Sequence, residues 1–564
     1  MKQLKDLYIA LMAKTLTAYT DAHIRDYFLR VQREGLTEHG FARLTSNLGI
    51  LIAHGIRTDL TGLFLDMMDF TCAEIPKGKA ANDFSVREIV CCIDAVARAG
   101  VADEARIEGW KHALCTIDPT VTYDVYAKTP TDKVRNWALF TAVSEYARMR
   151  AGLGGSMEFI ETQIASQLQW IDENGMYSDH AGTDVHQPMV YDLVPRGLFA
   201  ILLHFGYRGR YFDVIDGIIR KAALYTLAMQ SVTGEAPYGG RSNQFVHNEP
   251  WLMTVFTFEY NRYQREGNAP LMRRYGAAIA RALQVTEEWL SRDGIRHIKN
   301  RFPLDSRYGC EGYGYFDKYM ITTASFLYTA YLLTEDGTEL SACEEDTEAE
   351  SFATSYRFHK VFLKNSGYAL EFDTNADPKY DAKGLGRVHR AGAPSALCLS
   401  VPCPRAKGAK YTVDRADAKR LAIAPALFRD GAWEEGTANG VRHTLTALDR
   451  SGRYATFRYT FSSGDAVTGD YAITEEGITV TLSGTGKLAL MLPAFLFDGE
   501  AETEIAQGEG TLTVSYGGWR CTYTTDGTIE DTGRVACNRN GYYKAFRAVK
   551  EGTLCVTIEF EKNA

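Results

Sequence analysis

The sequence lacks long apolar runs, paired cysteines and an excess of basic charge, and each absence excludes a class of protein. No stretch of about 18 uncharged apolar residues occurs, so a membrane span is not expected. The 11 cysteines form no C-x-x-C pair, which gives little support to a disulfide framework or a cysteine zinc site. The formal net charge of −9 argues against nucleic acid as a partner, because nucleic-acid binding requires clustered Lys and Arg.

The composition is that of a soluble globular chain, with 45% apolar and 24% charged residues. The 564 residues predict two or three domains. Lys14 and Asp21 interrupt the apolar residues of the amino-terminal segment, so a secretion signal is not expected. These features together predict a cytoplasmic protein. They leave open whether it forms a homo-oligomer.

The hydrophobic pattern divides the chain into two halves. In residues 1–334, apolar positions recur at intervals of three and four, which predicts about a dozen helices joined in hairpins by short turns. No repeat of about 34 to 47 residues is present, as an open solenoid would require. We therefore expect the helices to close into an (α/α)6 toroid.

The pattern changes after an acidic connection at 335–354. Apolar and polar residues then alternate, for example over 478–483 and 554–560, as they do in half-buried strands. Residues 355–564 are expected to form an antiparallel β-sandwich domain. The predicted fold class is thus an α+β multidomain protein, with the toroid first.

Two long polar loops in the helical half carry candidate functional residues, because catalytic groups collect on loops held by a rigid scaffold. The loop at 172–187 contains Asp179, His180 and His186; its alternative is a solvated turn. The loop at 233–249 has two adjacent glycines, which permit unusual backbone angles. They are followed by Arg241, Asn243, Gln244, His247 and Glu249.

Pro250 suits the first position of a helix, which would place Glu249 at or near its cap. The positive end of that helix would favour the ionised form of Glu249, as a general base requires. The alternative is that Glu249 or Asn248 only caps the helix.

Further polar residues lie at predicted helix ends, and each alone is more often a cap or a surface charge. In the β half, the segment 372–390 is too long for a hairpin turn and is expected to reach back over the mouth of the toroid. These additional candidates are Glu88, Asn136, Trp137, Tyr191, Glu311 and Tyr313, with Arg387 and His389 in the β half.

The sequence contains none of the common catalytic or cofactor motifs. H-E-x-x-H is absent, so no metal site is expected. G-x-S-x-G and P-loop patterns are absent as well, which disfavours serine-elbow hydrolysis and NTP chemistry. No cofactor is expected.

Several strings of the sequence are distinctive, among them ENGMYSDH (173–180), GGRSNQFVHNE (239–249), EGYGYFDKYM (311–320) and DPKYDAKGLGRVHR (377–390). They resemble bacterial carbohydrate-active proteins of glycoside hydrolase family 154, the β-glucuronidases. More distantly, they resemble the uronate lyases of the heparinase II/III type. The resemblance covers most of residues 130–390 and implies an (α/α)6 barrel with a carboxyl-terminal β-sandwich.

The resemblance implies an enzyme that releases glucuronic acid from the non-reducing end of oligosaccharides or glucuronides. Arg241 would hold the uronate carboxylate through its planar fork. Asp179 would be the general acid and Glu249 the base, since glycoside hydrolysis needs two carboxyl groups. His180 and His247 would orient them, with Glu88 and Glu311 in reserve. Substrate contacts are expected from Arg241, Asn243, Gln244, Asn136, Trp137, His186, Tyr191, Glu311, Tyr313, Arg387 and His389.

Two other functions stay open at this stage. A lyase would use Tyr191, Tyr177 or a histidine to remove the proton at C5 of the sugar, while Arg241 and Asn243 neutralise the carboxylate. A non-catalytic protein that binds acidic glycans is the third possibility. The density of ionisable groups in the two loops argues against it.

Overall fold

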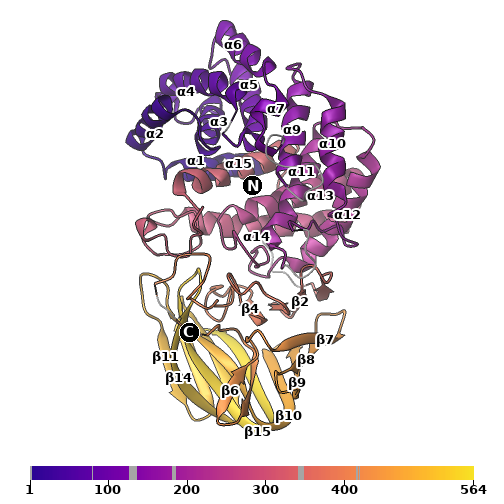
Figure 1. The fold of residues 1–564 in the computed structure, drawn as a ribbon, viewed down its shortest axis with the longest axis vertical. Coiled ribbons are helices and arrows are strands. Elements are labelled where there is room, and N and C mark those ends of the chain that lie inside the picture. The colour runs from indigo at the N-terminus through magenta and orange to yellow at the C-terminus, as the bar shows by residue number, and fades with distance from the viewer. Residues whose placement is uncertain are drawn as a thin grey trace.

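The computed structural model describes residues 3–78, 80–125, 136–180, 186–340, 348–414, 417 and 419–563. The centre of the predicted acidic connection, 341–347, lies outside the described residues. A helical half is followed by a β half, and the two halves meet across a single interface (Figure 1). Fourteen α-helices are present in the described part, all of them before Thr334.

Six helices form a closed inner ring. Each contacts the next in chain order, and the last contacts the first, so the predicted toroid is confirmed. Most residues of these helices are buried, and the helices that begin at Gly40, Met189 and Phe316 are the most apolar. The six helices are α3 (Gly40–Ala53), α5 (Val86–Arg98), α9 (Trp137–Arg150), α11 (Met189–His204), α13 (Asn248–Arg265) and α15 (Phe316–Leu333).

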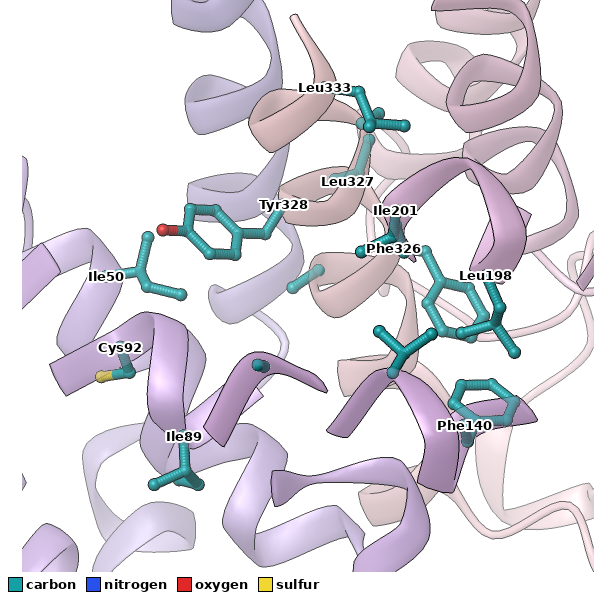
Figure 2. Close-up of a cluster of buried hydrophobic side chains, with 14 of the residues drawn as sticks. Ile50, Ile89, Cys92, Phe140, Leu198, Ile201, Phe326, Leu327, Tyr328 and Leu333 are labelled. Carbon is teal, nitrogen blue, oxygen red and sulfur yellow. The ribbon is translucent and has the colours of Figure 1, made fainter. Parts of the chain in front are cut away.

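The inner helices fill the centre of the ring with large apolar side chains. Figure 2 shows Phe140 of α9, Leu198 of α11 and Phe326 of α15 in this core. Gly197 allows α11 to approach α13 closely, because a Cβ atom there would lie 2.4 Å from the ring of Trp251. The centre of the toroid is therefore packed.

The outer helices are more exposed and cover the ring. Several of them begin with a side-chain cap, for example Thr20, whose hydroxyl accepts from the His23 N–H at 3.2 Å. The outer helices are α1 (Leu4–Leu16), α2 (Asp21–Glu34), α4 (Thr61–Glu74), α6 (Glu104–Cys115), α10 (Met157–Leu168), α12 (Phe212–Met229) and α14 (Ala269–Leu290), with the single turn α7 (Pro119–Thr122). Short 3-10 turns lie at Thr58–Leu60, Ile75–Lys77, Asn82–Phe84 and Leu304–Ser306.

The β half contains two antiparallel sheets. The smaller has the order β1-β2-β3-β4, from β1 (Glu350–Ala353), β2 (Lys360–Asn365), β3 (Tyr368–Asp373) and β4 (Gly384–Arg390). The larger contains β5 (Pro425–Arg429), β6 (Ala432–Glu435), β7 (Arg442–Leu448), β8 (Tyr454–Thr460), β9 (Ala466–Ile473), β10 (Ile478–Phe497), β11 (Glu504–Gly508), β12 (Thr511–Tyr516), β13 (Trp519–Thr525), β14 (Thr528–Cys537) and β15 (Tyr542–Lys562).

The alternating segments of the sequence pair with each other in the larger sheet. Residues 478–483 of β10 face residues 553–558 of β15, so that Val480 lies opposite Val556. The buried faces of the two sheets share one apolar core, in which the rings of Phe372 and Phe457 lie 4.7 Å apart. The predicted sandwich is confirmed, because two antiparallel sheets pack face to face over this core. Its first strand begins at Glu350, slightly earlier than expected.

The small sheet also lies against the helical half. Phe352 of β1 stacks on Tyr225 of α12, with ring centroids 4.3 Å apart. The segment 372–390 lies against the same end of the toroid, where Asp373 pairs with His186 and Asp381 accepts from the Gly240 N–H (Figure 1). In the parts of the chain that the structure covers, no helix is long and apolar enough to span a bilayer.

Candidate active site at the mouth of the toroid

The amino-terminal ends of the inner helices meet at one mouth of the toroid, because successive inner helices are separated by outer helices that run back. Helix amino termini carry partial positive charge and exposed N–H groups, so this mouth favours anions although the whole chain is acidic. Residues chosen from the sequence occupy it: Glu88 on α5, Asn136 and Trp137 at the start of α9, Tyr191 on α11, His247 and Glu249 at α13, and Glu311 and Tyr313 before α15.

The loop that leads into α13 has a strained backbone. Ser242 and Gln244 have φ of 58° and 62°, and two glycines with positive φ precede them. A non-glycine residue in this region costs about 1–3 kcal/mol and persists only where the surroundings fix it. Here the Gly240 N–H donates to Asp381 at 2.6 Å, and a Cβ atom on Gly239 would meet Lys360 at 3.2 Å. The loop is therefore held between the toroid and the small sheet.

Arg241 is the centre of this loop. Its guanidinium forms an ion pair with Asp179 and stacks on the ring of Tyr191, 4.3 Å from the ring centroid. One third of its side chain, 33%, is exposed, whereas the side chain of Asp179 is only 4% exposed. Asn136 also donates to Asp179, at 2.9 Å. Burial raises the pKa of Asp179, and the neighbouring Arg241 opposes this effect.

Ser242, the residue after Arg241, binds two tyrosines and a second carboxylate. Its hydroxyl lies 2.6 Å from the Tyr313 hydroxyl and 3.2 Å from the Tyr191 hydroxyl. Its N–H donates to Glu311 at 2.6 Å, and Arg539 donates to the same carboxylate at 2.7 Å. Asp179 and Glu311 are thus held by the side chain of Arg241 and the backbone of the next residue.

Glu249 does not join this cluster in the described contacts. It is completely buried and accepts from Lys299 at 2.6 Å and from the Ala236 N–H at 3.1 Å. Burial raises its pKa, and Lys299 opposes this. The helix begins at Asn248 with His247 at the cap, so Pro250 is its third residue and not its first, as the sequence had suggested.

The two histidines that were expected to orient the carboxylates lie in different surroundings. His247 packs among aromatic rings, 5.2 Å from Phe245 and 6.0 Å from Tyr319, and burial lowers its pKa to about 3. Its ring has no hydrogen bond to Glu249 among the described contacts. His180 is the electrostatic neighbour of Asp179, and burial lowers its pKa as well.

The remaining candidates of the helical half lie outside this cluster. Glu88 binds Arg43 at 3.2 Å and accepts from Ser325 at 2.7 Å, within the ring of inner helices. Trp137 packs edge-on against Phe84, with ring centroids 4.7 Å apart. Asn243 and Gln244 are buried in the loop.

The candidates from the β half form the interface between the halves. Arg387 and His389 lie on strand β4 and not on a loop, and both are buried. Arg387 binds Glu371 at 3.0 Å, and the ring of His389 lies 2.7 Å from the hydroxyl of Ser231. His186 is paired in the same way with Asp373, at 2.8 Å. Arg387 also donates to the Ala236 carbonyl at 2.9 Å, so Arg387, His389 and His186 each bond to the other half of the chain. The described contacts include none between these residues and Arg241.

Sequence reasoning missed Ser242 and Arg539. Ser242 stands between two residues that were chosen, so its position was the available signal. Arg539 comes from a region that gave no signal, more than 200 residues from its partner Glu311. In the described ranges, no group of three His, Cys, Asp or Glu residues is arranged to hold a metal ion.

Fold and site together define a helical toroid joined to a β-sandwich, with a polar cluster at its anion-favouring mouth. No protein family matches the sequence, and no curated protein matches it. Similar solved structures include chondroitin AC lyase from Streptomyces coelicolor, at 11% identity over 98% of this chain and 82% of the other, with a TM-score of 0.47. A heparinase III is 10% identical over 94% and 85%, with a TM-score of 0.36. A family 88 glycosyl hydrolase from Bacteroides vulgatus is 12% identical over 59% and 99%, with a TM-score of 0.37.

Proposed function

We propose that this chain is an enzyme acting on glycans or glycosides that carry a uronic acid, and that Arg241 binds the uronate carboxylate. The observation that carries the proposal is the partly exposed guanidinium of Arg241 at the mouth, which pairs with the buried Asp179 and stacks on the ring of Tyr191. A planar guanidinium suits a carboxylate through two parallel hydrogen bonds. The surrounding helix amino termini add to the attraction.

The chemistry that this site supports first is acid/base hydrolysis with release of glucuronic acid. Asp179 suits the general acid, because burial favours its protonated form. Glu311 replaces Glu249 as the proposed base, because the Ser242 N–H donates to it and so places it next to Arg241 and the two tyrosines. Glu249 has no described contact with these residues, and its ion pair with Lys299 fits a structural role better.

One observation favours a second chemistry, β-elimination at C5 of the uronate. The hydroxyl of Tyr191 lies beside Ser242 while its ring contacts Arg241, so a base and a carboxylate-binding cation are adjacent. Tyr177, the other tyrosine considered, is completely buried and donates to Gln167 at 2.6 Å. Elimination would therefore use Tyr191.

Product analysis separates these functions. The protein is incubated with a panel of glucuronides and uronate oligosaccharides, and the products are assayed for free glucuronate and for the ultraviolet absorbance of an unsaturated uronate. Free glucuronate alone supports hydrolysis, and the unsaturated product supports elimination. Binding without turnover would indicate a glycan-binding protein, and neither binding nor turnover would refute the proposal.

Variants then test the assigned residues. Asp179→Asn and Glu311→Gln should each lower hydrolytic turnover about 10²- to 10⁴-fold, the usual contribution of a general acid or base. Asp377→Asn is the matched control, because this half-buried carboxylate lies near His180 but does not bind Arg241 in the described contacts. Turnover within a few-fold of wild type in either test variant would remove that residue from its role.

A further inference from the structure

Asp179 and Arg241 form a pair in which only one member is accessible. The carboxylate is enclosed, and its described hydrogen-bond partners are the cation Arg241 and the neutral amide of Asn136. The guanidinium is partly exposed at the mouth. A ligand carboxylate can therefore contact Arg241 directly, but it can affect Asp179 only by changing the position of Arg241.

The charge that balances Asp179 comes from Arg241 alone among the described groups that face it. His180, the other titratable neighbour, is kept neutral near pH 7 because burial lowers its pKa. Tyr191 and Tyr313 lie beside Arg241, and burial raises the pKa of Tyr313 far above its ordinary value. Asp377 faces His180 and adds only negative charge.

We propose that a bound uronate activates its own general acid, by drawing the guanidinium of Arg241 from Asp179 so that Asp179 takes up a proton. The inference rests on the proposed function and deepens it. A carboxylate without its counter-ion in a site shielded from water is strongly disfavoured and takes up a proton instead. The negative charge of the bound uronate acts in the same direction.

The proton balance of the cycle is closed. One proton enters Asp179 from solvent when the uronate binds. It passes to the glycosidic oxygen as the bond from C1 to that oxygen breaks, and the attacking water gives a proton to Glu311. When glucuronate leaves, Arg241 returns to Asp179, and Glu311 releases its proton to solvent.

This coupling makes the substrate carboxylate a requirement for catalysis as well as for binding. A neutral sugar leaves the pair of Asp179 and Arg241 intact, so Asp179 stays ionised and cannot donate. Discrimination between a glucuronide and the matching glucoside is then expected in kcat in addition to KM.

Isothermal titration calorimetry tests the inference without catalysis. Glucuronate is titrated into the protein at pH 7 in two buffers of different ionisation enthalpy, and the slope gives the number of protons bound. Wild type is expected to take up about one proton per glucuronate, since Asp179 changes its protonation state. Asp179→Asn is expected to bind glucuronate with no uptake, and Asp377→Asn, the control, to keep the uptake.

The possible failures are distinguishable. Glucuronate binding to wild type without proton uptake overturns this inference and leaves the proposed function standing, because Arg241 would then bridge both carboxylates. Absence of glucuronate binding refutes the proposed function itself. Should Asp179→Asn fail to fold, infrared difference spectra of wild type decide the question: a carboxylic acid band that appears on glucuronate binding supports the inference, and its absence overturns it.

Discussion

Replacing Arg241 by alanine should separate charged from neutral substrates. The side chain ends in a guanidinium that is one third exposed and held over Tyr191, so it is both reachable and oriented for a ligand. Loss of one charge-assisted, bidentate contact costs on the order of 1.5–3 kcal/mol, or about ten- to a hundredfold in kcat/KM. We expect this loss for a glucuronide.

The matching glucoside provides the internal comparison. Its turnover should not fall in Arg241→Ala, because a neutral sugar makes no use of the cation and Asp179 is then free to hold a proton. Arg357→Ala is the control variant. Arg357 is a second arginine close to Asp179, because it donates to the hydroxyl of the adjacent residue Ser178 at 3.1 Å. The assay is kcat/KM for both substrates with each folded variant. Equal losses on the two sugars would show that Arg241 is structural and would refute the reasoning.

Three further predictions concern the surroundings of the site. Tyr191→Phe should abolish formation of unsaturated product if elimination occurs, whereas Tyr177→Phe should change it little; the reverse result would exclude Tyr191 as the base. Glu249→Gln should lower the free energy of unfolding in urea by about 3–5 kcal/mol, because Lys299 is left charged in a buried site, and adding Lys299→Met should recover most of the loss; an unchanged stability of the single variant would contradict this. Burial raises the pKa of Asp381 to about 6, so this carboxyl group loses its proton at a lower pH in the unfolded chain than in the folded one. The free energy of unfolding therefore falls by about 3 kcal/mol as the pH rises from about 4 to about 6. Asp381→Asn should therefore be more stable than wild type at about pH 8 and equal to it at about pH 3.5, and no difference at the higher pH would refute the assignment.

The fold was accessible from the sequence because its two halves have different hydrophobic periods. The apolar spacing before Thr334 and the alternation in 478–483 and 554–560 each reflect a local geometry. Ring closure and strand order depend on contacts between distant segments, and no local pattern encodes them. The start of the small sheet at Glu350 was missed for the same reason, since its pairing partner is β2.

Part of the candidate cluster could be chosen from the sequence, because the loops that carry it are dense in polar groups. Asp179, Arg241, Tyr191, Glu311 and Tyr313 do lie in one connected cluster. Sequence could not show which carboxylates are paired with a buried cation.

Glu249 illustrates that limit, because its ion pair with Lys299 bridges 50 residues. Arg387 and His389 illustrate another. A buried interface between two domains uses the same charged residue types as a binding site, and only the fold separates the two.

A structure of Asp179→Asn with an intact glucuronide tests the central claim most directly, because this variant is expected to bind the substrate without cleaving it. The account predicts that both oxygens of the uronate carboxylate lie within hydrogen-bond distance of the Arg241 guanidinium, with the glycosidic oxygen next to residue 179. A sugar bound elsewhere, or one whose carboxylate points away from Arg241, would contradict it.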